Sequence, residues 1–246
     1  MNTVRYIYRY FRNSILRILA LLWGVKQKLP KNAIIISPHP DDEALGCGGL
    51  ISHLTKNRCN VHLIMLTGGE NCESANNMRK ENLKEIRRNL TKKSAIVLGI
   101  KEENIYFLNF IDGNVNSEDP ENIRLKEIIK KINADAIYVP HLMDGWNDHV
   151  QAHLIIKDII RSSSINLYAY CVWFWYIMPF KEARNLQWKN VCYFSMNKEE
   201  HNAKAQSINI YMKAISPDGI YYSGELPKIL LTSCLWKQEI YFRILH

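Results

Sequence analysis

Short apolar runs alternate along the chain with longer segments that place an apolar residue at every third or fourth position. Such runs, with their β-branched residues, predict buried strands at 33–36, 61–66, 105–110 and 136–140. Helical spacing predicts helices at 76–98, 123–132 and 148–161, and a less regular C-terminal third offers an aromatic strand at 167–176 and a helix at 199–215. The alternation predicts a single α/β domain with a mostly parallel sheet flanked by helices.

The first thirty residues differ from this pattern, because they read as a basic amphipathic helix. The first forty residues contain seven Lys or Arg and no acid, so they account for nearly all of the net charge of +8. For residues 1–24 two interpretations stay open: peripheral contact with a membrane interface, or packing on the chain's own domain. The apolar run 18–25 is too short to span a bilayer. The apolar face comprises Ile7, Phe11, Ile15, Ile18 and Leu22, and the opposite face Arg5, Arg9 and Arg12.

Composition narrows the class of protein. With 246 residues, 47% hydrophobic and 23% charged, the chain can bury one large core. The six cysteines have no paired spacing, which favours a reduced, cytoplasmic setting, with any membrane contact on the inner face of the cytoplasmic membrane. Nucleic-acid binding is not expected, because the aliphatic and aromatic content of the basic segment suits lipid better.

One imidazole and three carboxylates stand within five residues, His39-Pro40-Asp41-Asp42-Glu43, directly after the strand at 33–36. Like charges at this spacing resist burial unless a cation or a proton neutralises them. Because open α/β sheets bind ligands at the carboxyl ends of their strands, the run predicts a metal site there, with His39 and Asp42 turned towards one ion. Capping of the next helix is a second interpretation, which leaves His39 unexplained.

A second polar cluster follows the strand at 136–140 and runs from His141 to His153. It could supply the third protein ligand that catalytic zinc usually has. His149 and His153 would share a helix face, as in the H-E-x-x-H zinc proteases, but Val150 occupies the position of the catalytic Glu. That interpretation therefore lacks its base.

The order of these motifs resembles the PIG-L/LmbE-type zinc deacetylases from about residue 33 to residue 153. The resemblance implies a Rossmann-like domain over 31–246 that hydrolyses the acetamide of an N-acetylglucosamine-type sugar. It implies His39, Asp42 and His149 as zinc ligands and Asp41 as general base, and ferrous iron is a second candidate metal. The motifs that carry the resemblance are Pro-His-Pro-Asp-Asp-Glu (38–43), Leu-Gly-Cys-Gly-Gly (45–49), Leu-Thr-Gly-Gly-Glu (66–70), Phe-Ile-Asp-Gly (110–113) and Asn-Asp-His (147–149).

The resemblance also implies residues around the ligands. Glu70 and Asp112 would hold sugar hydroxyls, together with an arginine from the helix at 76–98. Arg79, Arg87 and Arg88 compete for that role, because the Glu that the family sets three residues later follows none of them; Arg79 and Arg88 are our candidates. Glu43, Asp144 and His153 are expected to support the ligands or line the edge of the site.

Trp146 is the main departure from the family, which usually places a histidine there, near the developing oxyanion. Trp donates one hydrogen bond but cannot become a cation, so we expect it to contact substrate. Either the metal and a group such as His141 or His153 meet the oxyanion, or catalysis is weakened. The sequence thus predicts a deacetylase of glycoconjugate or cell-envelope biosynthesis, whose sugar is free or carried on a nucleotide, lipid or glycan. The alternative is a metal-containing sugar-binding protein with impaired turnover.

Overall fold

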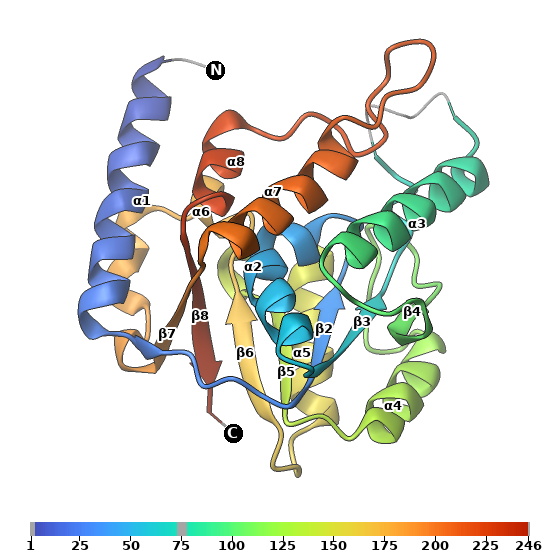
Figure 1. The fold of residues 1–246 in the computed structure, drawn as a ribbon, viewed down its shortest axis with the longest axis horizontal. Helices are drawn as coiled ribbons and strands as arrows, with labels where there is room; N and C mark the ends of the chain where they lie inside the picture. The colour runs from blue at the N-terminus through green and yellow to red at the C-terminus, as the bar shows by residue number, and fades with distance from the viewer. Residues whose placement is uncertain (1–2, 73–77, 246) are drawn as a thin grey trace.

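An eight-stranded sheet forms the centre of the computed structural model, which describes residues 3–72 and 78–245 (Figure 1). The strand order is β1-β7-β8-β6-β5-β2-β3-β4, and all neighbours are parallel except where β8 runs antiparallel to β6 and β7. The predicted single α/β domain with a mostly parallel sheet is confirmed. The strands are β1 (Val25–Lys26), β2 (Asn32–Ser37), β3 (Asn60–Met65), β4 (Ile105–Phe107), β5 (Ala136–Pro140), β6 (Asn166–Tyr170), β7 (Val191–Ser195) and β8 (Gln238–Ile244).

Helices cover both faces of the sheet, so its central strands are buried on both sides. Successive side chains of β2 alternate between two cores. Ala33 and Ile35 pack in the core under α2, α3 and α7, and Ile34 and Ile36 pack in the core under α4 and α5. The helices are α1 (Thr3–Trp23), α2 (Asp42–Lys56), α3 (Lys80–Val97), α4 (Glu121–Ile132), α5 (Asn147–Ile159), α6 (Phe174–Ile177), α7 (Lys198–Met212) and α8 (Lys228–Cys234).

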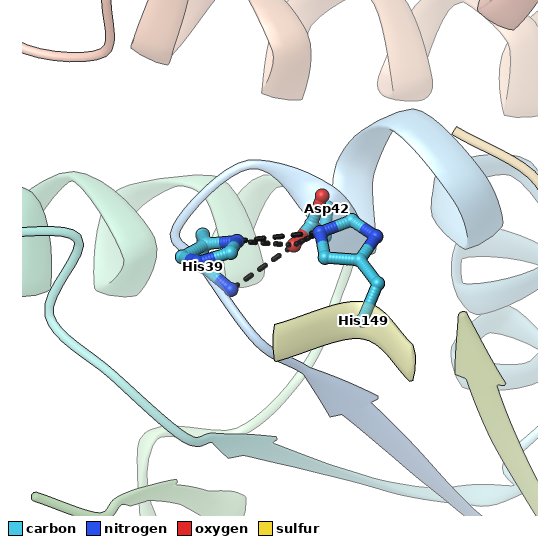
Figure 2. Close-up of side chains that lie close together, drawn as sticks. All are labelled: His39, Asp42 and His149. Carbon is cyan, nitrogen blue, oxygen red and sulfur yellow. Dashed lines mark hydrogen bonds and ion pairs between the residues drawn. The ribbon is translucent and has the colours of Figure 1, made fainter. Parts of the chain in front are cut away.

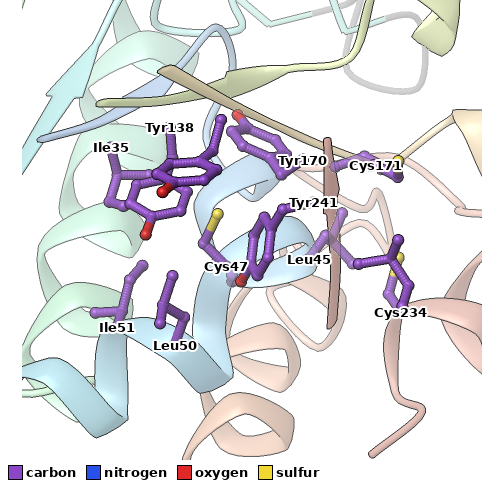
Figure 3. Packing of buried hydrophobic residues seen from close by; sticks show 14 of the residues in the cluster. Ile35, Leu45, Cys47, Leu50, Ile51, Tyr138, Tyr170, Cys171, Cys234 and Tyr241 are labelled. Carbon is purple, nitrogen blue, oxygen red and sulfur yellow. The ribbon is translucent and has the colours of Figure 1, made fainter. Parts of the chain in front are cut away.

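Helix α2 packs closely on the sheet at Gly46, where the glycine faces the ring of Tyr170. Figure 3 shows Tyr138, Tyr170 and Tyr241 of three neighbouring strands packed against the α2 side. A Cβ atom on Gly46 would lie 2.3 Å from the ring of Tyr170. The Tyr170 hydroxyl in turn donates a 2.8 Å hydrogen bond to the carbonyl of Ile36. The start of α2 is thereby held directly above the carboxyl end of β2.

The chain winds in two directions from β2. It proceeds through α2, β3, α3 and β4 to one side, then returns by α4 to β5 on the other side. Open α/β sheets bind ligands in the crevice that such a reversal leaves outside the carboxyl ends of the strands. The segments that follow β2 and β5 therefore meet at one place.

Several predicted boundaries were wrong. The strand expected at 105–110 ends at Phe107, and the aromatic run expected as a strand at 167–176 leaves the sheet after Tyr170 and becomes α6. Bulky aromatic residues suit a buried strand and a buried turn equally well, so the pattern did not separate them. The helix expected at 76–98 is α3, with residues 76 and 77 outside the described ranges. The C-terminal pattern predicted α7 but neither the β7–β8 pair nor α8.

Helix α1 packs on its own domain beside β7, and the two-residue strand β1 pairs with β7 at that edge of the sheet (Figure 1). The face that packs on the domain carries the buried polar residues Arg12, Asn13 and Arg17 as well as the buried Leu16 and Ala20, whereas Phe11 and Ile18 are exposed. Residues Thr3–Trp23 are helical, and large apolar side chains such as Phe11 and Ile18 face outwards, which is the reverse of the ordinary docking of an amphipathic helix. No helix in the described ranges is both long and apolar enough to cross a bilayer.

Candidate metal centre

The turn after β2 brings His39 and Asp42 together. The backbone amide of His39 donates to Asp42 Oδ2 at 3.0 Å, and the Asp42 amide donates to the His39 carbonyl at 3.3 Å. The two bonds close the turn and direct both side chains to the same side. His39 Nδ1 lies 3.4 Å from Asp42 Oδ2.

The third member of the group comes from the segment that follows β5, the neighbour of β2 in the sheet. After β5 the chain forms a short 3-10 helix, Leu142–Asp144, and enters α5. His149, in the first turns of α5, is fully buried, with Nε2 3.1 Å from Asp42 Oδ2 and 3.3 Å from His39 Nδ1. Figure 2 shows the three side chains converging from two elements.

The three atoms fit a metal ion. Their separations of 3.1, 3.3 and 3.4 Å are close to the spacing of about 3.3 Å between tetrahedral ligands whose bonds to zinc are about 2.0–2.1 Å. Two imidazole nitrogens and one carboxylate oxygen are donors that zinc and ferrous iron both accept. His39, Asp42 and His149 could therefore hold a metal ion.

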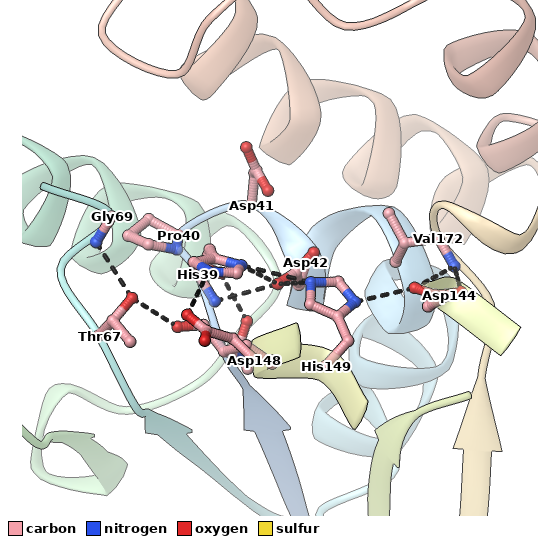
Figure 4. Close-up of polar contacts among 12 residues, drawn as sticks. His39, Pro40, Asp41, Asp42, Thr67, Gly69, Asp144, Asp148, His149 and Val172 are labelled. Atoms are coloured by element: carbon pink, nitrogen blue, oxygen red, sulfur yellow. Dashed lines mark hydrogen bonds and ion pairs between the residues drawn. The ribbon is translucent and has the colours of Figure 1, made fainter. Parts of the chain in front are cut away.

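Carboxylates on the outer side orient both imidazoles. His149 Nδ1 donates to Asp144 Oδ2 at 2.9 Å, and Asp144 is held by the backbone amides of residues 172, 173 and 174 (Figure 4). His39 Nε2 lies 3.1 Å from both Asp112 Oδ1 and Asp148 Oδ2. Ligand histidines commonly use such partners to fix the tautomer and the ring orientation.

His39, Asp112 and Asp148 also form a close group of potential ligands. A neutral imidazole has one nitrogen that accepts and one that donates. If Nδ1 faces Asp42 and His149 as a ligand, Nε2 carries the hydrogen and donates to the carboxylates. The second group is thus best explained as support for the first.

The close carboxylates change the acidity of the histidines. Burial by itself would lower the pKa of His149, but Asp42 and Asp144 outweigh it and raise the pKa to about 9. Burial also tends to lower the pKa of His39, but the ring's hydrogen bonds to the carboxylates of Asp112, Asp148 and Asp42 outweigh burial and raise this pKa well above its usual value. The carboxylates are balanced by positive charge, which protons or a divalent cation can supply.

Asp41 lies beside this group in a strained backbone conformation. Its φ of 116° is in a region that residues other than glycine rarely adopt, and its side chain makes no capping bond to α2. Figure 4 shows its carboxylate directed away from the three grouped side chains. Burial is the main cause that raises the pKa of Asp41, and the charge of Asp42 is the next. The guanidinium of Arg87, with Nη2 3.7 Å from Asp41 Oδ2, acts in the opposite direction and lowers this pKa. Its role as a base stays a prediction.

Glu43 supports the turn from inside the molecule. It is fully buried, and its carboxylate accepts hydrogen bonds from the amide of Asp41 at 3.2 Å, from the Ser94 hydroxyl at 3.0 Å and from the Tyr211 hydroxyl at 2.5 Å. Ser37 Oγ lies 3.3 Å from the same carboxylate. Glu43 therefore joins the metal-site turn to α3 and α7.

The predicted substrate contacts lie in different places. Glu70 accepts hydrogen bonds from the amides of Gly68 at 3.1 Å and Asp112 at 3.4 Å, so it braces the loop that holds Asp112 against His39. Arg79 is exposed at the start of α3, and Arg88 donates to Asn109 Oδ1 at 2.8 Å. Neither arginine has a described contact with the metal-site turn, and their substrate roles stay predictions.

Arg87 is the arginine that reaches the turn. It is buried and donates to the carbonyls of Pro40 and Gly69, both at 2.8 Å. The sequence left Arg87 in competition with Arg79 and Arg88, because none of the three is followed by the Glu that the family sets three residues later. Asp148 belongs to the Asn-Asp-His motif (147–149), but the sequence assigned it no role; its position directly before His149 was the available signal.

Trp146 lies at the start of α5 with its side chain half-exposed, and its ring meets Trp173 edge to face at 5.5 Å. The histidines considered as substitutes are occupied elsewhere. His141 accepts from the amide of Met143 at 3.0 Å, and burial lowers its pKa to about 3, so it is neutral. His153 donates to the Pro140 carbonyl at 2.9 Å, and burial lowers its pKa too.

Comparison with known proteins places this site in context. The diacetylchitobiose deacetylase of Thermococcus kodakarensis is 32% identical over 116 residues, which are 47% of this chain and 42% of that protein. The 1D-myo-inositol 2-acetamido-2-deoxy-alpha-D-glucopyranoside deacetylase of Corynebacterium diphtheriae is 25% identical over 162 residues, 54% of this chain and 53% of that one. The chain thus spans about half the length of the curated relatives it matches.

A solved structure shows the same fold. The N,N'-diacetylchitobiose deacetylase from Pyrococcus horikoshii superposes with a TM-score of 0.60 at 21% identity, over 77% of this chain and 72% of that one. The family model described as "PIG-L: GlcNAc-PI de-N-acetylase" matches residues 34–160, a region that includes His39, Asp42 and His149. Because that match covers half of the chain, the chain belongs to the PIG-L family.

Proposed function

We propose that the protein is a metal-dependent N-deacetylase of N-acetylated amino sugars. The observation that carries the proposal is the triangle of His39 Nδ1, Asp42 Oδ2 and His149 Nε2, with edges of 3.1 to 3.4 Å, within the region that matches the PIG-L family. Zinc is the proposed ion, and ferrous iron is the second candidate for the same donor set.

Hydrolysis of an acetamide needs an activated water and a proton for the departing amine. When bound, the ion would polarise the acetamide carbonyl and lower the pKa of a water towards about 7. Asp41 is the proposed base that takes a proton from the attacking water and returns it to the amine nitrogen as the C–N bond breaks. The products are acetate and a free amino sugar.

The proposed substrate carries N-acetylglucosamine. The names of both curated relatives describe deacetylases of acetamido sugars, which supports this substrate class. Trp146, three residues before His149 at the start of α5, offers a half-exposed ring, and such a surface suits the apolar face of a sugar. Glu70 and Asp112 are the proposed partners of its hydroxyls. The sugar's carrier, whether nucleotide, lipid or glycan, and a place in cytoplasmic glycoconjugate or cell-envelope synthesis belong to the same proposal.

The test is a screen for acetate release by zinc- or iron-loaded full-length protein on N-acetylglucosamine, its nucleotide sugars and its lipid-linked forms. Asp41→Asn should keep the metal and lose about 10²- to 10⁴-fold in kcat. Asp158→Asn, an exposed change on the helix that carries His149, is the matched control and should keep full activity. Equal activity of the Asp41 variant and the wild type would refute the proposed mechanism.

A metal-containing sugar-binding protein is the second candidate, and Trp146 favours it. The ring cannot become a cation at the place where the family usually has a histidine, and neither His141 nor His153 is positioned to replace it. For this candidate, wild-type protein would bind sugar but release acetate no faster than Asp41→Asn. Metal-dependent acetate release above that background would exclude it.

A further inference from the structure

The outer face of α1 takes no part in the proposed chemistry. The helix is held to the domain by buried arginines. Arg12 donates to the main-chain carbonyls of Trp175 and Met178, and Arg17 donates to those of Ser233 and Gln238. The guanidinium of Arg17 also lies 3.6 Å from the ring centroid of Trp236. These contacts fix the rotation of the helix about its axis.

The opposite face of α1 is therefore directed outwards, and it is apolar. Phe11, Ile18 and Leu22 are 63%, 56% and 71% exposed, although each would be a core residue in an ordinary amphipathic helix. Together they form a stripe along a helix of 21 residues, or about 30 Å. We call this set the α1 stripe: Ile7, Phe11, Ile15, Ile18 and Leu22.

The charged residues of α1 and of the segment that follows it are all basic in sequence, and Asp135 is an acid that contacts the far end of that segment, at the amides of Lys31 and Asn32. Lys26, Lys28 and Lys31 are exposed on the segment that follows the helix, and the first acid in the sequence is Asp41. Tyr8 and Tyr10 flank the stripe and are 56% and 41% exposed. Tyrosine rings favour the headgroup level of a bilayer, where an apolar ring and a polar hydroxyl are both satisfied.

We propose that the α1 stripe docks on the surface of an anionic lipid bilayer, with the helix axis in the plane of the membrane. Lipid satisfies both parts of this surface at once, because acyl chains accept the apolar stripe and anionic headgroups attract the lysines. A second copy of the chain could cover the apolar stripe but would offer no anionic headgroups to Lys26, Lys28 and Lys31. The proposal is independent of the deacetylase chemistry.

The stripe and the lysines contribute differently. Insertion of the side chains at the interface provides most of the attraction and depends little on salt. Each lysine near the surface strengthens binding about fivefold at low salt, and that part is screened by added salt. Binding should therefore be stronger on anionic than on neutral vesicles and weaken as salt increases.

The experiment is co-sedimentation of the full-length protein with phosphatidylcholine vesicles that do or do not contain phosphatidylglycerol. Ile18→Ser/Leu22→Ser removes two side chains of the α1 stripe. The control is Ile96→Ser/Ile123→Ser, which removes two similarly exposed side chains, 57% and 67%, on α3 and α4. We expect the stripe variant to bind anionic vesicles at least about tenfold more weakly and the control to bind as the wild type does.

Circular dichroism and thermal unfolding check that both variants fold. Failure of the wild type to bind anionic vesicles, equal binding to neutral ones, or equal loss in both variants would overturn the proposal. Concentration-dependent dimerisation that the stripe variant abolishes, in the absence of vesicle binding, would also overturn it, in favour of a second copy. The readout is binding, so it does not depend on acetate release.

Discussion

His39 shows how neighbours determine the chemistry of one ring. Asp112 and Asp148 face its Nε2 atom, each at 3.1 Å, so Nδ1 is left to face Asp42 and His149. Asp148 itself is held by the amides of Gly113 and Val115, at 2.7 and 3.1 Å. The loop after β4 thereby holds Asp148 of α5 in place, and Asp148 in turn orients the candidate ligand His39 in the turn after β2.

This arrangement predicts the effect of Asp148→Asn. The amide is a weaker acceptor than the carboxylate, so His39 should be less well oriented and less basic as a ligand. Loss of such a partner typically weakens metal affinity about 10- to 100-fold. Competition with a chromophoric chelator measures this affinity, and Asp158→Asn on the same helix is the control. Unchanged zinc affinity in Asp148→Asn would show that the carboxylate does not act through His39.

The sequence predicted the candidate ligands and one supporting partner, Asp144, but not the other, Asp148. His39 and Asp42 lie three residues apart after an apolar run, and local spacing was enough to group them. That Asp148 would turn to His39 depends on how two loops meet in space, which a one-dimensional pattern does not contain. The sequence could not show whether Arg87 or Arg88 is the buried one, because that depends on how α3 is rotated about its axis against the rest of the domain.

At the scale of elements, α2 depends on close approach to the sheet. Gly46 allows the helix to pack against Tyr170, and the adjacent turn places Asp42 and His39. The apolar alternation along the chain predicted the parallel strands around it, whereas α2 itself was anticipated only through the acidic run that could cap its start. It did not predict the ends of β4 or β6, because their continuations are as apolar as the strands.

Gly46→Ala should therefore destabilise the fold. The added methyl group would lie 2.3 Å from the buried Tyr170 ring, which is bonded to Ile36 and cannot easily move. Overpacking of this kind costs about 1–3 kcal/mol of unfolding free energy. Urea unfolding measures it, with Lys56→Ala, an exposed change in the last turn of α2, expected to cost less than about 0.5 kcal/mol. A Gly46 variant as stable as the wild type would contradict the tight contact.

At the scale of the whole molecule, the C-terminal third supports the metal-site helix. Lys204 of α7 and Glu239 of β8 form a buried ion pair of 2.6 Å. Lys204 also donates to the carbonyl of Leu45, and Glu239 accepts from the amides of Gly49 and Leu50, each at 2.8 Å. These residues lie far apart in sequence, so no local pattern could predict that they meet.

Removal of one partner should be costly. Lys204→Met leaves the Glu239 carboxylate buried without its cation, which typically costs about 3–5 kcal/mol. Lys204→Met/Glu239→Gln removes the uncompensated charge and keeps an acceptor for the α2 amides, so it should recover a large part of that stability. A double-mutant cycle by urea unfolding measures the coupling. Additive effects of the two changes would show that the pair is not coupled.

The most direct test of the central claim is a titration of metal-stripped protein with Zn²⁺, in which acetate release from an N-acetylglucosamine substrate and bound zinc are measured together. The account predicts that both rise in parallel and saturate at about one ion per chain, and that His149→Ala loses both. Full acetate release in the presence of chelator would contradict it. So would His149→Ala protein that binds zinc and releases acetate as the wild type does.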